Sequence, residues 1–263
     1  MLSRRLPKNQ IKVVFANTGE EDERTLEFIQ RCGIEWDLDI VWVEADINPQ
    51  KGKGTGHRVV TFETATRDHS LFEQMIDKYG IPNKNYPHCT RELKLHPIHD
   101  YVKSSCWDAG YLTAIGIRAD EIDRINPNYQ QLGLTYPLCD IGVRKGQVFA
   151  FWDKQPFDLT VPEHRGNCVW CWKKSLRKQL TLAKETPQVF KFAMRMEEQH
   201  ADSGRVFFRD RRTSKDIIEL AREPFETFLD ERYLDQNEGC EDGCEINDPS
   251  QMSMVKLWKD AAE

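Results

Sequence analysis

Residues 11–45 read IKVVFANTGEEDERTLEFIQRCGIEWDLDIVWVEA, and this stretch decides the fold class. Its first five residues, IKVVF, are a short apolar run typical of a buried parallel strand. Residues 20–32 have the composition and the apolar side expected of a helix, and residues 38–45 form a second apolar run. This succession predicts a strand–helix–strand unit and therefore an α/β protein.

The start of the helix is expected next to Thr18, because Thr18 and Glu21 have the spacing of a capping box. After about residue 125 the alternation of strands and helices fades into segments rich in Pro, Gly and Asn. Four further elements are expected before that point: a short strand over 57–64, a helix over 71–80, a helix over 89–95 that Pro97 limits or kinks, and a strand over 111–117.

Length and composition limit the class of protein. The chain has 263 residues, and its 37 basic and 43 acidic residues give a net charge of −6. This charge weighs against nucleic acid as a partner, so an anionic ligand would have to meet a local basic cluster. No long apolar run is present, so no membrane association is expected. The first residues do not form a secretory signal, and we expect a cytoplasmic protein.

The eight cysteines are too few for a disulfide scaffold in a chain of this length. Cys168 and Cys171 form a C-x-x-C pair, followed by Lys173 and Lys174, which suits metal ligation or a redox dithiol. Cys89 heads a predicted helix, whose dipole would stabilise its thiolate, and a small core residue is an equally good interpretation. The remaining cysteines are a Gly-rich pair suited to ligation or thiol chemistry, Cys240 and Cys244, and three with a core interpretation, Cys32, Cys106 and Cys139.

Two groups of cations are candidates for anion binding. Arg118 directly follows the strand predicted over 111–117, where α/β sheets bind ligands, and its guanidinium suits a phosphate. A surface salt bridge with Asp120 or Glu121 is an equally good interpretation. Arg91 and Lys94 lie close to another predicted element end. The second group is the basic cluster Arg205–Arg212, which is typical of a solvated face, with a phosphate or RNA contact as the alternative.

Five stretches together resemble the phosphoadenylylsulfate/adenylylsulfate (PAPS/APS) reductases, within the adenine nucleotide α-hydrolase-like proteins, and most closely the reductase-like proteins of bacteriophages. They span roughly residues 10 to 246. They are VVFANTGEEDERTLEFI (13–29), HCTRELKLHP (88–97), LTAIGIRADE (112–121), KQPFDLTVPEHRGNCVWCWKKS (154–175) and GCEDGCEI (239–246). The resemblance implies a Rossmann-like, open, mostly parallel sheet with an irregular cysteine-bearing C-terminal region. It also implies that an adenine nucleotide, either APS/PAPS or ATP, lies near Thr18 and Gly19, with Arg118 on its phosphate or sulfate.

The resemblance further implies a metal centre. In the iron–sulfur branch, two adjacent cysteines and the C-x-x-C hold a [4Fe–4S] cluster. Here Cys89, Cys168 and Cys171 would supply three ligands, and Cys240 or Cys244 the fourth, with His88 in reserve. The same set also suits zinc, and the residues leave the two metals open. Cys244 resembles the terminal cysteine that attacks the sulfate in these reductases, a step that a thiol reductant assists.

One family element is missing from the sequence. The family opens with a strand and an S-G-G-x-[DT]-S loop that cradles phosphates, whereas IKVVF here matches the second strand. We expect either a start at an internal methionine or a true loss of the loop. The expected organisation is a Rossmann-like core over 1–125, a helical and irregular metal-binding region over 126–246, and a polar tail over 247–263.

Three functions remain open on the sequence. The first is a sulfonucleotide-reductase-like enzyme, or a related sulfur or adenylyl transferase, with a cysteine-bound metal, working in the cytoplasm of a bacterium or a phage-infected host. The second is a non-catalytic adenine-nucleotide-binding protein. The third is a zinc-stabilised nucleic-acid-binding module that uses the basic cluster Arg205–Arg212, against which the acidic net charge weighs.

Overall fold

The computed structural model describes residues 10–50, 52–105 and 110–230. They form two compact units: the first combines residues 10–105 with Asp158–Asp230, and the second contains Gly110–Phe157. The units alternate along the chain, whereas the sequence predicts boundaries after residues 125 and 246, and that division stays a prediction. None of the described helices is both long enough and apolar enough to cross a membrane.

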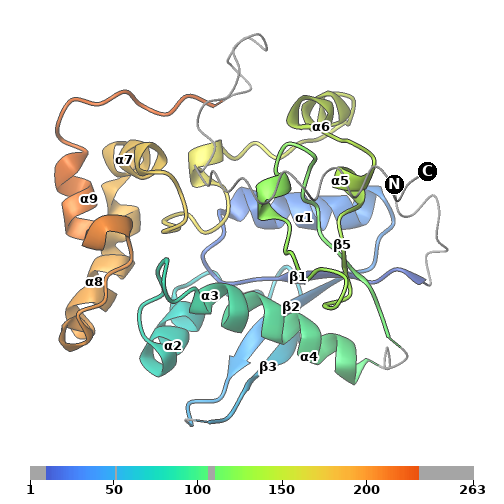
Figure 1. Cartoon of the computed structure of the whole chain (residues 1–263), viewed down its shortest axis with the longest axis horizontal. Helices are drawn as coiled ribbons and strands as arrows, with labels where there is room; N and C mark the ends of the chain where they lie inside the picture. The colour runs from blue at the N-terminus through green and yellow to red at the C-terminus, as the bar shows by residue number, and fades with distance from the viewer. Residues whose placement is uncertain (1–9, 51, 106–109, 231–263) are drawn as a thin grey trace. The chain divides into compact units, whose positions relative to one another are not determined.

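The first unit holds most of the regular structure (Figure 1). Its strands are β1 (Val13–Ala16), β2 (Ile40–Ile47) and β3 (Thr55–Val60). Its helices are α1 (Glu23–Glu35), α2 (Ser70–Tyr79), α3 (His88–Thr90), α4 (His96–Ser104), α7 (Leu176–Glu185), α8 (Lys191–Gln199) and α9 (Ser214–Leu220). A π-helical segment, Arg91–Leu95, joins α3 to α4, and short 3-10 turns lie at Glu163–Arg165, Pro187–Phe190, Ala201–Ser203 and Arg209–Arg211.

The predicted strand–helix–strand unit is confirmed. β1 pairs in parallel with β2, with Phe15 opposite Trp42, and α1 connects them. β3 then pairs antiparallel with β2, with Val60 opposite Trp42, so the order is β1-β2-β3. The class is therefore mixed α/β.

Helices cover both faces of this sheet because side chains of β2 alternate between them. On one face Trp42 packs with Phe15, at a ring-centroid distance of 4.8 Å, and with Leu26 of α1. On the other face Ala45 and Ile47 join a larger core with residues of α2 and the π-helical segment. Figure 1 shows α1 on one side of the strands and α2 and α4 on the other.

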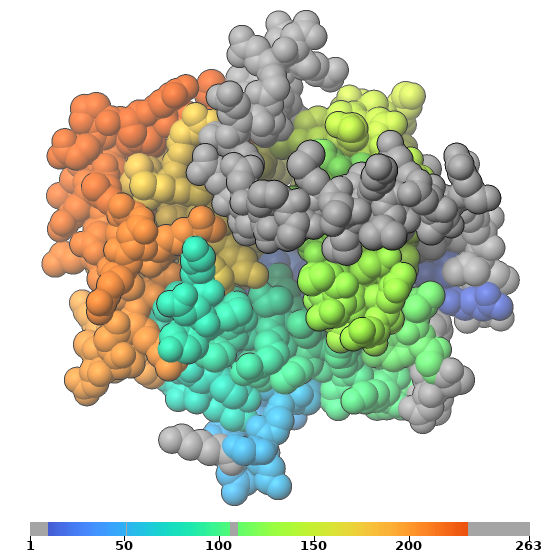
Figure 2. Space-filling model, viewed as in Figure 1, coloured from blue at the N-terminus to red at the C-terminus, as the bar shows by residue number. Residues whose placement is uncertain are grey.

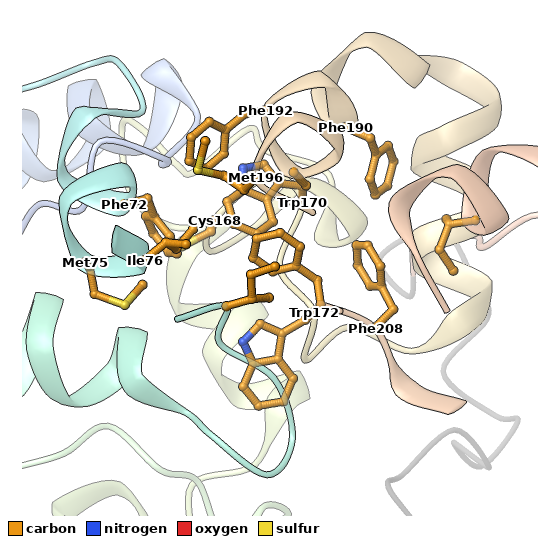
Figure 3. Packing of buried hydrophobic residues seen from close by; sticks show 14 of the residues in the cluster. Phe72, Met75, Ile76, Cys168, Trp170, Trp172, Phe190, Phe192, Met196 and Phe208 are labelled. Carbon is orange, nitrogen blue, oxygen red and sulfur yellow. The ribbon is translucent and has the colours of Figure 1, made fainter. Parts of the chain in front are cut away.

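The larger core is built around the C-x-x-C segment. Trp170, between the two cysteines, is 2% exposed and contacts Phe72 of α2 and Phe207 at ring-centroid distances of 5.1 and 4.9 Å. Figure 3 shows Trp170 and Cys168 among side chains of α2 and α8. Burial of such aromatic rings contributes a large share of core stability, so the position of the cysteines is fixed by packing.

One prediction about a helix start is wrong, and so is one of two alternatives for a helix end. Helix α1 begins at Glu23, and its N-cap is Asp22, which accepts a hydrogen bond of 3.2 Å from the Arg24 amide. Thr18 and Glu21 do bond to each other, but they do so in the preceding loop. Of the two alternatives for Pro97, the one in which it limits the helix is wrong, because helical structure continues to Ser104. Because Pro97 has no amide to donate to the preceding turn, the π-helical pattern just before it keeps the helix continuous.

The second unit contains little regular structure. Only Thr113 and Ala114 of the strand predicted over 111–117 are extended and paired, and they pair in parallel with Leu134 and Thr135. This pairing is short because Gly133, at φ +63°, turns the chain directly before its partner strand. The elements of this unit are β4 (Thr113–Ala114), a 3-10 turn (Ile122–Arg124), β5 (Leu134–Thr135), α5 (Pro137–Asp140) and α6 (Lys145–Trp152).

Candidate functional site: an anion cradle beside three thiols

The loop that follows β1 begins with a buried amide. Asn17 is fully buried, and its Nδ2 donates to Glu44 Oε1 at 2.6 Å and to the Thr66 carbonyl at 2.8 Å. Glu44, also fully buried, accepts from Arg58 at 2.6 and 2.9 Å. Gly19 follows at φ +78°, and a side chain there would overlap the Asp68 carbonyl oxygen. The loop therefore has a fixed conformation that requires Asn17 and Gly19.

The carboxylate of Glu21 lies in a cradle of donors formed by its own loop. It accepts from the Thr18 amide at 3.0 Å, the Thr18 hydroxyl at 2.8 Å and the Glu20 amide at 3.3 Å. Lys94 Nζ lies 3.9 Å from the same carboxylate, which is only 4% exposed. Clustered N–H groups and a cation are the arrangement that binds phosphate and sulfate in proteins. In this structure the carboxylate of Glu21 accepts the hydrogen bonds of these donors.

The same loop is joined to the C-x-x-C segment. The Val169 amide donates to the Glu20 carbonyl at 3.0 Å, as part of a single antiparallel bridge between Glu21 and Cys168. The Thr18 hydroxyl lies 3.6 Å from Cys168 Sγ. Trp170 Nε1 donates to Glu20 Oε2 at 2.6 Å. Residues about 150 positions apart in sequence thus form one site.

Three thiols lie next to this cradle. Cys89 and Cys171 are partly buried and pack against the core that contains Cys168, which is 8% exposed. Burial raises the pKa of Cys168 well above its usual value, with the negative charge of Glu21 adding to the effect. Burial also raises the pKa of Cys89. Without a further positive charge these two sulfurs remain protonated at neutral pH.

Three lysines surround the thiols. Burial lowers the pKa of Lys94, but the charges of Cys168, Glu21, Cys171 and Cys89 outweigh it and raise that pKa overall, so Lys94 is cationic. Burial lowers the pKa of Lys174 to about 8, while its Nζ donates to the carbonyls of Cys168 and Val169 at 2.9 and 2.6 Å.

Lys173 Nζ donates to the Thr90 hydroxyl at 3.0 Å, directly beside Cys89. This bond ties the C-x-x-C segment to the start of the helix that carries Cys89. The three ammonium groups give the site the positive charge that favours thiolates and anions.

One buried donor points to a sulfur ligand. The indole Nε1 of Trp172 is buried and has no hydrogen-bond partner among the residues that the structure describes, and Trp172 is 5% exposed. It lies close enough to the Cys89 thiol to act against the effect of burial by lowering the pKa of Cys89. Buried donors are rarely left unpaired, and a thiolate is a better acceptor than a thiol. An ionised Cys89 sulfur would therefore satisfy this N–H better than the protonated thiol does.

The donor set suits [4Fe–4S] or zinc in chemistry, since three cysteines belong to or pack against the same core. Within residues 10–50, 52–105 and 110–230, no group of three Cys, His, Asp or Glu side chains has ligation geometry. Cys240 and Cys244 lie outside the described residues, as does Cys106. His88, the reserve ligand, has its ring 5.9 Å from those of both Tyr79 and Tyr86.

The structure gathers some of the predicted site residues and not others. Those gathered are Thr18, Gly19, Lys94, Cys89, Cys168 and Cys171. Arg91 instead donates to Glu92 at 2.6 Å and lies over the Tyr79 ring. Arg118 belongs to the second unit, where it pairs with Asp120 and Glu121 at 3.0 and 3.2 Å, as in the salt-bridge interpretation.

Sequence reasoning missed Glu21, Glu20 and Trp170 as site residues. The capping-box spacing assigns Glu21 to the helix start, whereas Glu20, Glu21 and Asp22 precede the observed helix and Glu23 begins it. Trp170 had one available signal, its position inside the C-x-x-C pair. Lys174 was noted for its charge, but its burial has no signature in the sequence.

These features define a mixed α/β protein with an anion cradle beside a site of three cysteines and three lysines. The chain is 35% identical over 181 residues to an uncharacterized nin region protein of Escherichia phage lambda. The matched residues cover 68% of this chain and 61% of that protein. It is 27% identical over 164 residues to an uncharacterized protein of Methanocaldococcus jannaschii, over 62% of this chain and 30% of that protein.

The matched region thus spans about three fifths of the phage protein and less than a third of the archaeal one. No family model matches the chain, and no solved structure matches it.

Proposed function

We propose that the chain is a sulfonucleotide-reductase-like enzyme that binds an adenine nucleotide bearing a sulfate or phosphate and carries a cysteine-bound metal centre. The observation that carries this proposal is the Glu21 cradle, in which Thr18, the Glu20 amide and Lys94 surround one carboxylate beside Cys168. An anionic group of a ligand fits the position that this carboxylate holds. The same proposal includes the fold: we assign the sheet to the Rossmann-like type of the adenine nucleotide α-hydrolase-like proteins.

The location of the cradle supports nucleotide binding. It follows the carboxyl end of β1, next to the parallel neighbour β2, which is where open α/β sheets bind their ligands. Lys94 would neutralise the bound phosphate or sulfate, and the Thr18 hydroxyl would donate to one of its oxygens. The neighbouring thiols would then lie beside the charged end of the nucleotide.

Cys89, Cys168 and Cys171 would hold the metal, with a fourth ligand such as Cys240. A bound [4Fe–4S] cluster would supply positive charge and redox chemistry next to the nucleotide, and zinc would supply positive charge alone. The Trp172 N–H would donate to the Cys89 sulfur in that state. Metal binding would also remove the protons that burial now holds on Cys89 and Cys168.

The nucleotide half of the proposal is tested by thermal shift with adenylyl sulfate, phosphoadenylyl sulfate and ATP. A ligand at 100 times its Kd adds about 2.7 kcal/mol to stability, a readily measured shift. Lys94→Ala should reduce the shift, and Glu21→Gln should increase it because it removes the competing carboxylate charge. Lys103→Ala, which removes an exposed lysine of α4, is the control. No shift with any of the three nucleotides would contradict nucleotide binding.

The metal half is tested by anaerobic purification followed by metal analysis and visible absorption. An iron–sulfur cluster gives broad absorption that bleaches on reduction, and zinc gives none. Cys168→Ser and Cys171→Ser should each lower the metal content. Cys32→Ser is the matched control, since Cys32 lies in α1 and packs outside the thiol site. Full metal content in both site variants would refute these ligands.

A further inference from the structure

A cavity of about 430 Å³ that no cradle residue lines lies between the turn at residues 83–86 and the segment 204–211. Figure 2 shows these two segments against each other, in teal and orange. The cavity is lined by four basic residues and one acidic residue. Its local charge is therefore positive, whereas the net charge of the chain is negative. The basic residues are Lys84, Arg205, Arg209 and Arg211, and the acidic one is Asp210.

Three of these cations are available to a ligand. Lys84, Arg209 and Arg211 are exposed, and none forms an ion pair or side-chain hydrogen bond with any described residue. The single lining carboxylate, Asp210, is engaged by Arg212 at 2.5 Å. Unpaired cations gathered around one hollow attract an anionic ligand, whereas cations paired with carboxylates do not.

The fourth cation is held against an aromatic ring. The Arg205 guanidinium lies 4.2 Å from the centroid of the Tyr86 ring and donates to the Tyr79 carbonyl at 3.1 Å. Gly80 makes room for it, because a side chain at Gly80 would overlap the Arg205 guanidinium. Tyr86 is 43% exposed, so its ring still presents aromatic surface at the cavity.

The walls of the cavity are fixed. Asn83 Nδ2 donates to the Val206 carbonyl at 3.0 Å, which joins the two segments, and the Asn83 and Tyr86 backbones bond reciprocally at 3.1 Å. On the other wall Asp210 and Arg211 both have φ +58°, a conformation unusual for side-chain-bearing residues, and the Phe208 amide closes this turn on the Arg212 carbonyl. The site exists before a ligand binds.

We infer that this cavity binds single-stranded nucleic acid, with phosphates on Lys84, Arg209 and Arg211 and a base against Tyr86. A cationic groove with an aromatic ring at its wall is how proteins bind single strands without reading their sequence. An acidic peptide would use the cations but not the ring. The inference does not depend on the proposed function, because the residues of the cavity are distinct from those of the cradle.

Fluorescence anisotropy of the full chain with labelled oligo(dT) and oligo(U) of about 12 nucleotides tests the inference. We expect binding at low salt, weaker binding to duplex of the same length, and little competition from thymidine monophosphate, uridine monophosphate or polyglutamate. In the double variant Arg209→Ala with Arg211→Ala, the slope of log Kd against log salt concentration should be smaller by about 1.4. This is the change expected when two phosphate contacts on a single strand are lost.

A matched double variant, Lys103→Ala with Lys191→Ala, removes two exposed charges outside the cavity and should keep the wild-type slope. Tyr86→Ala should weaken binding about tenfold, and Tyr86→Phe, which keeps the ring, should not. Melting temperatures show whether each variant is folded.

Four results would overturn the inference: no binding of either oligonucleotide, equal loss in the cavity and control variants, equal binding by Tyr86→Ala, or competition by polyglutamate or a mononucleotide as strong as by the oligonucleotide.

Discussion

Trp170 Nε1 donates a hydrogen bond of 2.6 Å to the buried carboxylate of Glu20, and this bond joins the C-x-x-C segment to the loop after β1. The other oxygen of Glu20 is bonded to His69 Nδ1 at 2.6 Å. His69 in turn stacks on Phe192 of α8 at 4.3 Å. One carboxylate therefore connects three segments of the first unit, and the stability of the site depends on its partners.

Replacing Trp170 with Phe should destabilise the protein by about 2 kcal/mol. The change removes one donor from a buried carboxylate and leaves space between Phe72 and Phe207. Urea unfolding measures the loss. Trp36→Phe, at the half-exposed C-cap of α1, is the matched control and should stay within about 0.5 kcal/mol. Equal losses in the two variants would show that the bond to Glu20 contributes nothing specific.

The Glu20–His69 pair should make stability depend on pH. The hydrogen bond to Glu20 raises the pKa of His69, against the opposing effect of burial and of nearby Arg195, while Asp68 adds to the rise. A raised pKa in the folded state stabilises the protein below the unfolded value of about 6.5, and this contribution is lost as the pH rises through the folded pKa. Burial likewise raises the pKa of Glu20. Its contribution to stability therefore also decreases as the pH rises.

The check is His69→Gln, which keeps a donor for Glu20 but cannot titrate. The wild type should exceed the variant in free energy of unfolding by more at pH 6 than at pH 8.5. Urea unfolding at both values measures the difference. Parallel stability curves over this range would contradict the assignment of the titration to His69.

The fold was predictable where its signals are local. The strand at residues 11–15, the helix after it and the strand at 38–45 follow from short apolar patterns. The start of α1 was predicted wrongly because Thr18–Glu21 has the same spacing as a capping box, and only the backbone conformation identifies Asp22 as the cap.

The site was predictable only in part, because its contacts are long-range. The bond from the Val169 amide to the Glu20 carbonyl and the ring contact between Arg205 and Tyr86 join residues more than a hundred positions apart. No local pattern specifies such pairs. The structure places Thr18 near Cys168 and packs Cys89 and Cys171 against the same core, whereas the role of Glu21 as an internal anion follows from hydrogen-bond geometry alone.

Gly19→Ala should destabilise the protein by more than about 1 kcal/mol, because φ is +78° and the new Cβ would overlap the Asp68 carbonyl. The cradle would distort with it, so nucleotide-induced thermal shifts should also fall. Gly54→Ala is the control, since nothing lies within 4 Å of its Cβ position and its φ is ordinary. A Gly19→Ala protein as stable as Gly54→Ala would mean that the loop has another accessible conformation.

Asn17→Asp should be the most damaging single-atom exchange near the cradle. Asn17 Nδ2 lies 2.6 Å from Glu44 Oε1, and both residues are fully buried. An ionised Asp at position 17 would place two carboxylates together and remove the donor to the Thr66 carbonyl, for a loss of about 3 kcal/mol at pH 7. The charge repulsion raises the folded-state pKa of the new carboxyl, so the loss should shrink as the pH falls toward about 5.

Asn48→Asp makes the same change at an exposed position, where the side-chain oxygen accepts from the Gln50 amide at 2.9 Å, and it should be neutral within about 0.5 kcal/mol. Urea unfolding of both variants at pH 5 and pH 7 measures the two losses. Because Arg58 already compensates the charge of Glu44, a loss at Asn17→Asp that does not change with pH would mean that this guanidinium also neutralises the second carboxylate.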